Sequence, residues 1–211
     1  MLVGCDKVTF GVVYLISPDF GRHKTRTTLP TFGVSMAVPH FHLRQVSPEV
    51  IYSDGGFLAA DQTIVARLKE LAEVAPRRRC RLCFHGDADA DQQEMLIVMH
   101  RDSYVRPHRH LAKVETLGIV EGACDAVLFD ETGRVTDFLA MTPVADGGSF
   151  FYRMPSGLFH TLIFRSEWLV YLETTIGPFD RSKTEAASWA PPETDADAGR
   201  AYLASLALPV R

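Results

Sequence analysis

The chain has 211 residues, a formal net charge of −4 and a hydrophobic fraction of 46%. These values are ordinary for one globular domain with attachments, or at most two small domains. With no block of basic residues, nothing indicates a nucleic-acid partner. No apolar run approaches the roughly 18 residues that cross a bilayer, so we expect no membrane partner. Four cysteines in a chain of this length do not make a disulfide framework, which favours a reducing, cytoplasmic location.

Residues 1–45 give the weakest structural signals in the chain. An apolar segment comes first, and a polar, basic and turn-rich segment follows it. We interpret this range as an N-terminal extension that is poorly ordered. We expect the native start at Met36, which precedes the first segment that resembles the rest of the protein.

One helix is predicted between Asp61 and Pro76. Asp61 is a favourable N-cap, and a helix ends at or before the residue that precedes a proline. The apolar residues that recur at helical spacing are Ile64, Leu68, Leu71 and Ala75. A single apolar stripe of this kind predicts that the helix packs on the outside of a sheet.

From Arg79 onward the pattern changes to a period of two, which is typical of strands with one buried face. Turn signals such as D-E-T-G at 130–133 and A-D-G-G at 145–148 separate the segments. Many short strands between such turns favour an antiparallel sandwich or barrel over βαβ units. The expected strands are 79–85, 94–100, 104–110, 115–121, 124–130, 135–140, 149–153, 160–164 and 168–175.

Cys80 and Cys83 form a C-x-x-C motif in the first of these strands. A zinc site would need a second pair, and the sequence has none at a suitable spacing, so we interpret both as ordinary reduced cysteines. Residues three apart on a strand face opposite sides. Cys83 and His85 share a face, so we expect His85 to look into the barrel and to contact a substrate.

The stretch from Tyr104 to Gly122 contains the first half of a predicted metal site. His108 and His110 are two residues apart, so in an extended chain both point to the same face. Glu115 reaches the same point if the chain turns between them. Imidazole and carboxylate together are what a borderline divalent metal accepts.

The second half of the predicted site is His160. Pro155 and Gly157 predict a tight turn that places His160 at the start of the next strand. A lone histidine at such a position is usually structural. Its combination with the two earlier histidines and Glu115 makes it the fourth candidate ligand.

These two segments resemble a known pair of motifs. The patterns H-x-H-x4-E-x6-G, ending at Gly122, and P-x-G-x-x-H, ending at His160, resemble the two motifs of the cupin superfamily. A narrower resemblance to the WbuC-type cupin-fold metalloproteins covers residues 61–192. It is carried by R-x-C-x-x-C-F-H, Q-Q-E-M-L-I-V-M, S-Y-V-R-P-H-R-H-x-x-K-x-E and E-T-T-I-G-P-F-D. The chain departs from that family at Cys83, where the family has an asparagine.

The resemblance implies a mainly β fold with a single cupin domain, that is, a double-stranded β-helix or jelly-roll barrel. The domain would span 46–192 with its barrel core at 79–176, one N-terminal flanking helix and a C-terminal extended arm. Residues 193–211 are expected to form a tail or a short helix. The site would hold one divalent metal ion per chain, and the ligand types do not choose among Fe, Mn, Ni and Zn.

Several neighbours of the metal ligands have more than one interpretation. Tyr104 and Arg106 share the parity of His108, so an unbroken strand would turn them inward, Tyr104 as a proton donor or as a core tyrosine. Arg106 would bind a carboxylate or phosphate of the substrate, pair with Glu173, or point to solvent. Lys113 would be a substrate contact or general acid, or a solvated loop residue. Phe159 is expected to line the substrate pocket.

Three functions fit these residues. The first is a metal-dependent enzyme, such as an isomerase, that acts by Lewis-acid chemistry on a small polar anionic metabolite. Some relatives lie among polysaccharide-synthesis genes, so the resemblance implies a sugar derivative. The alternatives are an Fe(II)-dependent dioxygenase and a noncatalytic ligand-binding or sensor protein. The arm around Trp189 would pin itself to the barrel or to a second subunit in a homodimer.

Overall fold

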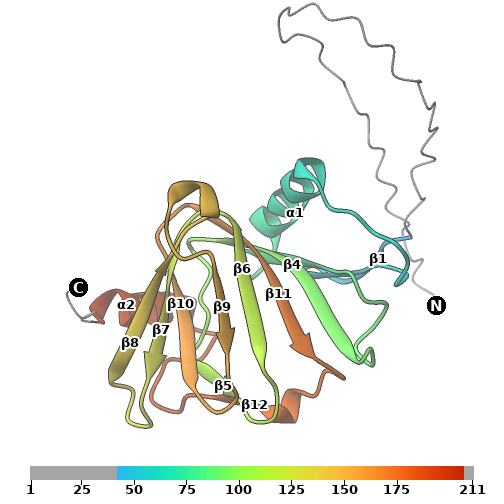
Figure 1. Ribbon diagram of the computed structural model, residues 1–211. Helices are drawn as coiled ribbons and strands as arrows, with labels where there is room; N and C mark the ends of the chain where they lie inside the picture. The colour runs from blue at the N-terminus through green and yellow to red at the C-terminus, as the bar shows by residue number, and fades with distance from the viewer. Residues whose placement is uncertain (1–41, 207–211) are drawn as a thin grey trace, which may run out of the picture.

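The computed structural model describes residues 42–206, and the expectations for residues 1–41, including a start at Met36, lie outside the described residues. The described chain forms two sheets (Figure 1). The seven-stranded sheet has the order β1 (Arg44–Ser47), β2 (Val50–Tyr52), β3 (Arg79–Cys83), β4 (Gln92–His100), β11 (Trp168–Ile176), β6 (Glu115–Glu121) and β9 (Phe151–Met154). The five-stranded sheet has the order β12 (Thr184–Ala186), β5 (His108–His110), β10 (Phe159–Phe164), β7 (Cys124–Phe129) and β8 (Val135–Met141).

The strands pair antiparallel except β2 and β3, which run parallel. Two helices and two 3-10 turns complete the described chain: α1 (Gln62–Val74), α2 (Ala196–Ser205), η1 (Val144–Asp146) and η2 (Arg181–Lys183). The result is a mainly β fold of two sheets with a flanking helix, so the predicted fold class is confirmed. Within residues 42–206, no helix has the length and apolar character needed to span a membrane.

Alternation along the strands builds three apolar layers. The central layer lies between the sheets and includes Ile97, Leu117, Leu162 and Tyr171 from four strands. A second layer lies between the seven-stranded sheet and α1. A third layer covers the outer face of the five-stranded sheet, where Trp189 contacts Phe129 and Phe159 within its own chain (ring centroids 5.1 and 5.8 Å apart).

Helix α1 forms where its sequence predicts it. The Asp61 carboxylate accepts hydrogen bonds from the backbone N–H groups of Thr63 and Ile64, and Ala75 leaves the helical conformation before Pro76. Ile64, Leu68 and Ala72 are the buried residues of the helix. They pack on Cys80 and Leu82 of the sheet, and Figure 1 shows the helix on the outside of that sheet.

The predicted strand 104–110 is shorter in the structure, where β5 contains only His108–His110. Pro107 has no backbone N–H to give to a ladder, and its carbonyl accepts from Ala187 of the C-terminal segment. That segment also supplies β12, a strand that was not predicted because its three residues are too few to show a period. The C-terminal helix α2 begins at Ala196, where the Asp195 side chain caps it by accepting from Ala198 N.

Gly122 allows the tight turn from β6 to β7. Its φ is +83°, and a Cβ at this position would lie 2.1 Å from the carbonyl oxygen of Trp168. Only glycine fits both the left-handed backbone and the approach of the neighbouring strand. The glycine of the first motif is therefore explained by packing, with no role at the metal.

We predict that Gly122→Ala destabilises the protein strongly. The left-handed backbone should cost about 1–2 kcal/mol, and the contact with Trp168 about 1–3 kcal/mol more. Gly147→Ala is the matched control, since Gly147 also has a positive φ (+77°) but nothing within 4 Å of a Cβ. The midpoints of urea unfolding would measure both, and equal losses would contradict the role of the Trp168 contact.

Candidate metal centre

Pairing of β5 with β10 brings the two sequence motifs together. His160 lies directly opposite His108 in this antiparallel pair, so their side chains share the inner face. His110 is two residues along β5 and shares that face, and Glu115 begins β6 in the other sheet. One donor atom from each of the four residues lies within 4.8 Å of the others. The structure therefore gathers all four predicted ligands at one point.

A backbone hydrogen bond fixes the turn that delivers His160. Gly157 N–H donates to the carbonyl oxygen of His110 at 2.8 Å, and Gly157 has a φ of +88°. The turn of the second motif is thus attached directly to a strand of the first motif. This bond sets the position of His160 relative to His110.

Two of the imidazoles are oriented in the same way. His108 Nδ1 lies 2.9 Å from the carbonyl oxygen of Arg106, and His160 Nδ1 lies 2.9 Å from that of Leu158, in each case two residues earlier. A carbonyl can only accept, so each Nδ1 carries the proton and donates. The Nε2 lone pairs of both rings are then free for a metal. His110 is held by Thr184, with Nδ1 3.2 Å from its Oγ1.

Glu115 is buried among polar partners. Its Oε2 lies 3.0 Å from His110 Nε2 and 3.8 Å from His160 Nε2, and the Tyr152 hydroxyl donates to its Oε1 at 2.7 Å. Burial by itself raises the pKa of Glu115, but the hydrogen bonds from His110 and His160 hold this pKa well below its usual range. The residue is therefore a carboxylate, as a metal ligand must be.

The histidine protonation states also suit a metal. Burial, with His160 close by, lowers the pKa of His108 to about 4, so this imidazole is neutral at pH 7. Burial lowers the pKa of His160 as well, but its bond to the Glu115 carboxylate outweighs this and raises the pKa overall. A divalent cation would compete with that proton. Three imidazoles and one carboxylate fit Fe, Mn, Ni or Zn.

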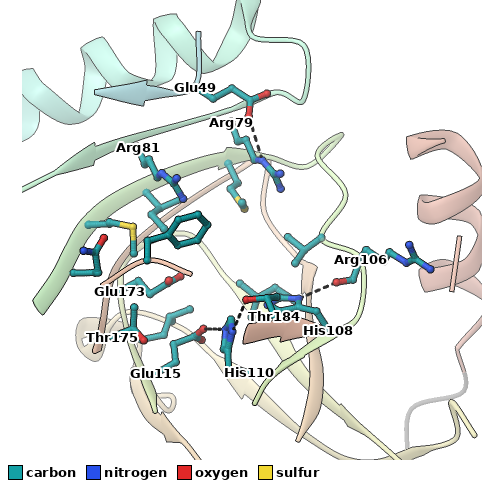
Figure 2. Close-up of a pocket in the computed structure, with 18 of the residues that line it drawn as sticks. Glu49, Arg79, Arg81, Arg106, His108, His110, Glu115, Glu173, Thr175 and Thr184 are labelled. Carbon is teal, nitrogen blue, oxygen red and sulfur yellow. Dashed lines mark hydrogen bonds and ion pairs between the residues drawn. The ribbon is translucent and has the colours of Figure 1, made fainter. Parts of the chain in front are cut away.

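The four residues line a cavity of about 720 Å³ between the sheets. Figure 2 shows His110 and Glu115 on one side of this space, with Glu173 and Arg81 beyond them. Besides Arg106, three of the other predicted site residues also line it: His85, Lys113 and Glu173.

These three residues differ in how they are held. His85 accepts from Glu94 N–H at its Nδ1 (2.9 Å), and Lys113 Nζ lies 5.8 Å from the centre of the Phe179 ring. The Glu173 side chain has no hydrogen bond or ion pair within residues 42–206. Burial and the nearby Glu115 carboxylate raise the pKa of Glu173 to about 8.

Two predicted contacts lie away from the cavity. Tyr104 packs under α2, where its ring would meet a Cβ on Gly199, and its hydroxyl donates to the Pro191 carbonyl at 3.0 Å. Tyr104 was expected to point inward as part of one strand with His108, but the strand begins only at His108, so this expectation is wrong. Phe159 lies on the outer face of its sheet, since it is adjacent to the inward-facing His160.

Arg106 contributes its backbone to the site. Its carbonyl orients His108, while its guanidinium donates to the carbonyl of Ala187 and points away from the histidines (Figure 2). It forms no ion pair with Glu173 or with any other described residue.

The structure adds residues that the sequence reading did not identify. Tyr152 could have been found, because alternation in β9 places it on the same face as the buried Met154. A stripe of alternating arginines at 77, 79 and 81 was also readable as one face of a strand. Thr184 gave no signal, since its strand has only three residues.

The family described as "Domain of unknown function (DUF6016)" matches residues 60–141, which include His108, His110 and Glu115. A search of curated proteins gave no match.

Among solved structures, the chain is similar to the capsular polysaccharide assembling protein CapF from Staphylococcus aureus (15% identity, TM-score 0.44, 54% of this chain and 32% of that chain). It is also similar to oxalate decarboxylase from Bacillus subtilis (19%, 0.38, 57% and 35%). A third is a cupin 2 conserved barrel domain protein from Rhodopseudomonas palustris (17%, 0.37, 49% and 63%). The chain thus spans about a third of the length of CapF and of oxalate decarboxylase. The narrower WbuC-type resemblance stays a prediction.

We predict that Tyr152→Phe weakens metal binding while the fold is kept. Loss of the hydroxyl leaves Glu115 Oε1 without its donor, and the loss of such an outer hydrogen bond typically costs 10–100-fold in metal affinity. Tyr171→Phe is the control, since its buried hydroxyl lies 3.6 Å from Met99 Sδ and touches no ligand. Competition with a chromophoric chelator would measure both, and unchanged affinity in Tyr152→Phe would contradict this role.

We predict that Glu173→Gln changes how the stability of the metal-free protein depends on pH. The pKa of Glu173 is about 8 in the folded chain, against an ordinary value of 4.5, so between these values the folded chain keeps a proton that the unfolded chain has released. The contribution of Glu173 to stability therefore falls as the pH rises through this window. Relative to wild type, Glu173→Gln should gain thermal stability at pH 9 compared with pH 4. A constant difference across this range would contradict the raised pKa.

Proposed function

We propose that the chain is a cupin-type metalloprotein that holds one divalent metal ion through His108, His110, Glu115 and His160. The observation that carries this proposal is the convergence of the four donor atoms within 4.8 Å on a cavity wall. The hydrogen bonds on the Nδ1 atoms of His108 and His160 support it, because they turn both Nε2 lone pairs toward the same point.

We further propose that the ligand is a small polar anionic metabolite such as a sugar derivative, in line with the WbuC-type resemblance and its link to polysaccharide synthesis. The cavity volume of about 720 Å³ lies in the range of small-molecule sites. Its lining combines the four metal-site residues with arginine and lysine side chains, which favour a negative charge on the ligand.

When bound at this centre, a divalent metal supplies a Lewis acid that polarises an oxygen of the ligand. The chain itself supplies the rest of the chemistry. Tyr152 and Thr184 hold Glu115 and His110 in place, and the apolar walls at Met95, Ile97 and Leu162 exclude water. Glu173 lies in the same cavity, and burial raises its pKa, which suits proton transfer to or from a polarised carbonyl, as in an isomerisation.

The same ligand set also suits Fe(II), so an iron-dependent dioxygenase is the second candidate for this centre. Oxygen consumption by the iron-loaded protein, absent with zinc, would favour it. Ligand binding without turnover would favour a noncatalytic sensor. The cytoplasmic location and the homodimer remain predictions of the sequence.

We predict stoichiometric metal in the wild-type protein and a large loss in His110→Ala. Elemental analysis of protein purified without chelators would measure the content, and thermal unfolding would check the fold. The control is His42→Ala, which removes an exposed histidine outside the cluster. Absence of metal from the wild type under every loading condition would overturn the metalloprotein proposal, and so would equal content in the two variants.

A further inference from the structure

Three arginines alternate along one face of the chain that enters β3. Arg77, Arg79 and Arg81 are two residues apart, and all three line the cavity. Arg78 and Cys80 between them face the other side, where Cys80 packs under α1. The cavity thus has a cationic stripe at β3, which β4 and β11 separate from β6 and Glu115 in the same sheet.

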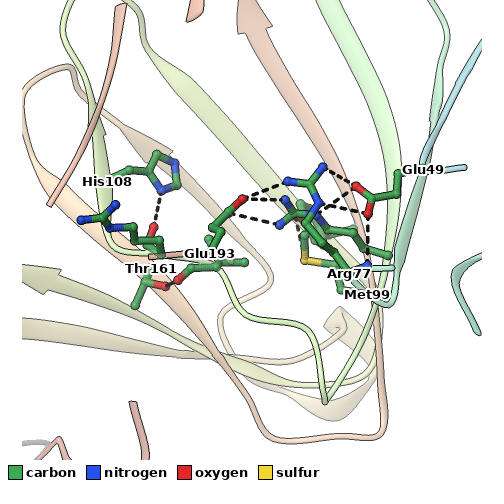
Figure 3. Close-up of polar contacts among 10 residues, drawn as sticks. Glu49, Arg77, Met99, His108, Thr161 and Glu193 are labelled. Atoms are coloured by element: carbon green, nitrogen blue, oxygen red, sulfur yellow. Dashed lines mark hydrogen bonds and ion pairs between the residues drawn. The ribbon is translucent and has the colours of Figure 1, made fainter. Parts of the chain in front are cut away.

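The first two arginines are neutralised by carboxylates. Arg77 Nε donates to Glu49 Oε1 at 3.0 Å and its Nη1 lies 2.9 Å from Glu193 Oε2. Arg79 Nη2 donates to the same Glu193 oxygen at 3.1 Å. Figure 3 shows Arg77 between Glu49 and Glu193. These ion pairs close the stripe at its Arg77 end and leave little attraction there for a ligand.

Arg81 differs from its two neighbours. Within residues 42–206 its side chain forms no ion pair with a carboxylate, its side-chain hydrogen bonding is to the weak acceptor of the Cys83 thiol, and its Nε is buried without a partner. Figure 2 shows its guanidinium in the cavity, on the same side as Glu173. Glu173 does not neutralise Arg81, because the two side chains form no salt bridge.

An unpaired guanidinium in a protein interior is costly, because it remains charged at any physiological pH and its N–H groups need acceptors. Of the other cations that line the cavity, Arg181 is exposed to solvent, and Arg106 and Lys113 are engaged with neighbouring groups. Arg106 donates to the Ala187 carbonyl, and Lys113 stacks over Phe179. Arg81 is therefore the cation of the cavity wall whose donors are left for a ligand.

We propose that Arg81 is the anion-binding residue of the cavity, and that it takes the carboxylate or phosphate group of a small ligand. The remainder of that ligand extends toward the four residues His108, His110, Glu115 and His160. This last step depends on the proposed function. The ligand would then carry an oxygen for the metal at one end and an anionic group at the other. A planar guanidinium binds both carboxylate and phosphate with two parallel hydrogen bonds, so the recognition is by geometry as well as charge.

The test is a calorimetric titration of the purified protein with inorganic phosphate, at fixed pH and ionic strength. We expect Arg81→Gln to weaken phosphate binding about tenfold or more, as for the loss of a charge-assisted bidentate pair. Arg81→Lys should lie between wild type and Arg81→Gln, since it keeps the charge and loses the fork. The matched control is Arg181→Gln, which removes an exposed arginine from the same cavity lining and should change the affinity less than twofold.

Absence of phosphate binding by the wild type would overturn the assignment, and so would equal losses in Arg81→Gln and Arg181→Gln. If Arg81→Gln fails to fold, as judged by circular dichroism, Arg81→Lys decides: wild-type affinity in that variant would count against bidentate recognition. Metal content is measured on the same samples and should be unchanged in the Arg81 variants. A wild type without metal would overturn the metal centre alone, because the phosphate titration compares Arg81 with Arg181 whether or not metal is present.

Discussion

Antiparallel pairing of β5 with β10 is the constraint on which the candidate metal centre depends. It places His108 opposite His160 on the inner face of the five-stranded sheet. A slip of one residue would exchange His160 with Phe159, which packs on Trp189 at the outer face. The Gly157–His110 backbone bond and the apolar contacts of Phe159 both oppose this slip. The register that packs the Phe159 ring against the outer apolar layer therefore also places the His160 imidazole on the inner face.

The polar groups of the centre satisfy one another before any metal binds. Burying a carboxylate is costly unless it is hydrogen-bonded, and Glu115 has a tyrosine hydroxyl and two imidazoles around it. Each histidine in turn has a hydrogen-bond partner at its Nδ1. Because the neighbouring positions Leu117 and Leu162 belong to the core between the sheets, the strands have reason to pack with or without a cation. Such a centre would be preorganised, and little of the binding energy of a metal would go into ordering the chain.

Much of this arrangement was readable from alternation and turn residues. The strand predicted at 115–121 agrees with β6, and the four candidate ligands come together because each lies on an inward parity close to a turn. The prediction was wrong where the alternation of inward and outward side chains was continued across a break in the strand. Tyr104 and Arg106 were assigned to one strand with His108, but Pro107 ends the ladder there and the C-terminal segment takes over both side chains. Contacts between residues 74 to 116 positions apart leave no local pattern, so Thr184 and Glu193 could not be placed in advance.

The C-terminal segment therefore acts as a wall of the site, although its sequence suggested only an attached arm. It supplies Thr184 to His110, the Ala187 carbonyl to Arg106, and Glu193 to the Arg77 and Arg79 pair. Each contact removes a donor or a charge that would otherwise face the cavity. The charges and donors that remain unpaired in the cavity therefore depend on the C-terminal segment as much as on the two sheets. The cavity is anionic near Glu115 and cationic at Arg81, and this polarity would orient an asymmetric ligand before any metal bond forms.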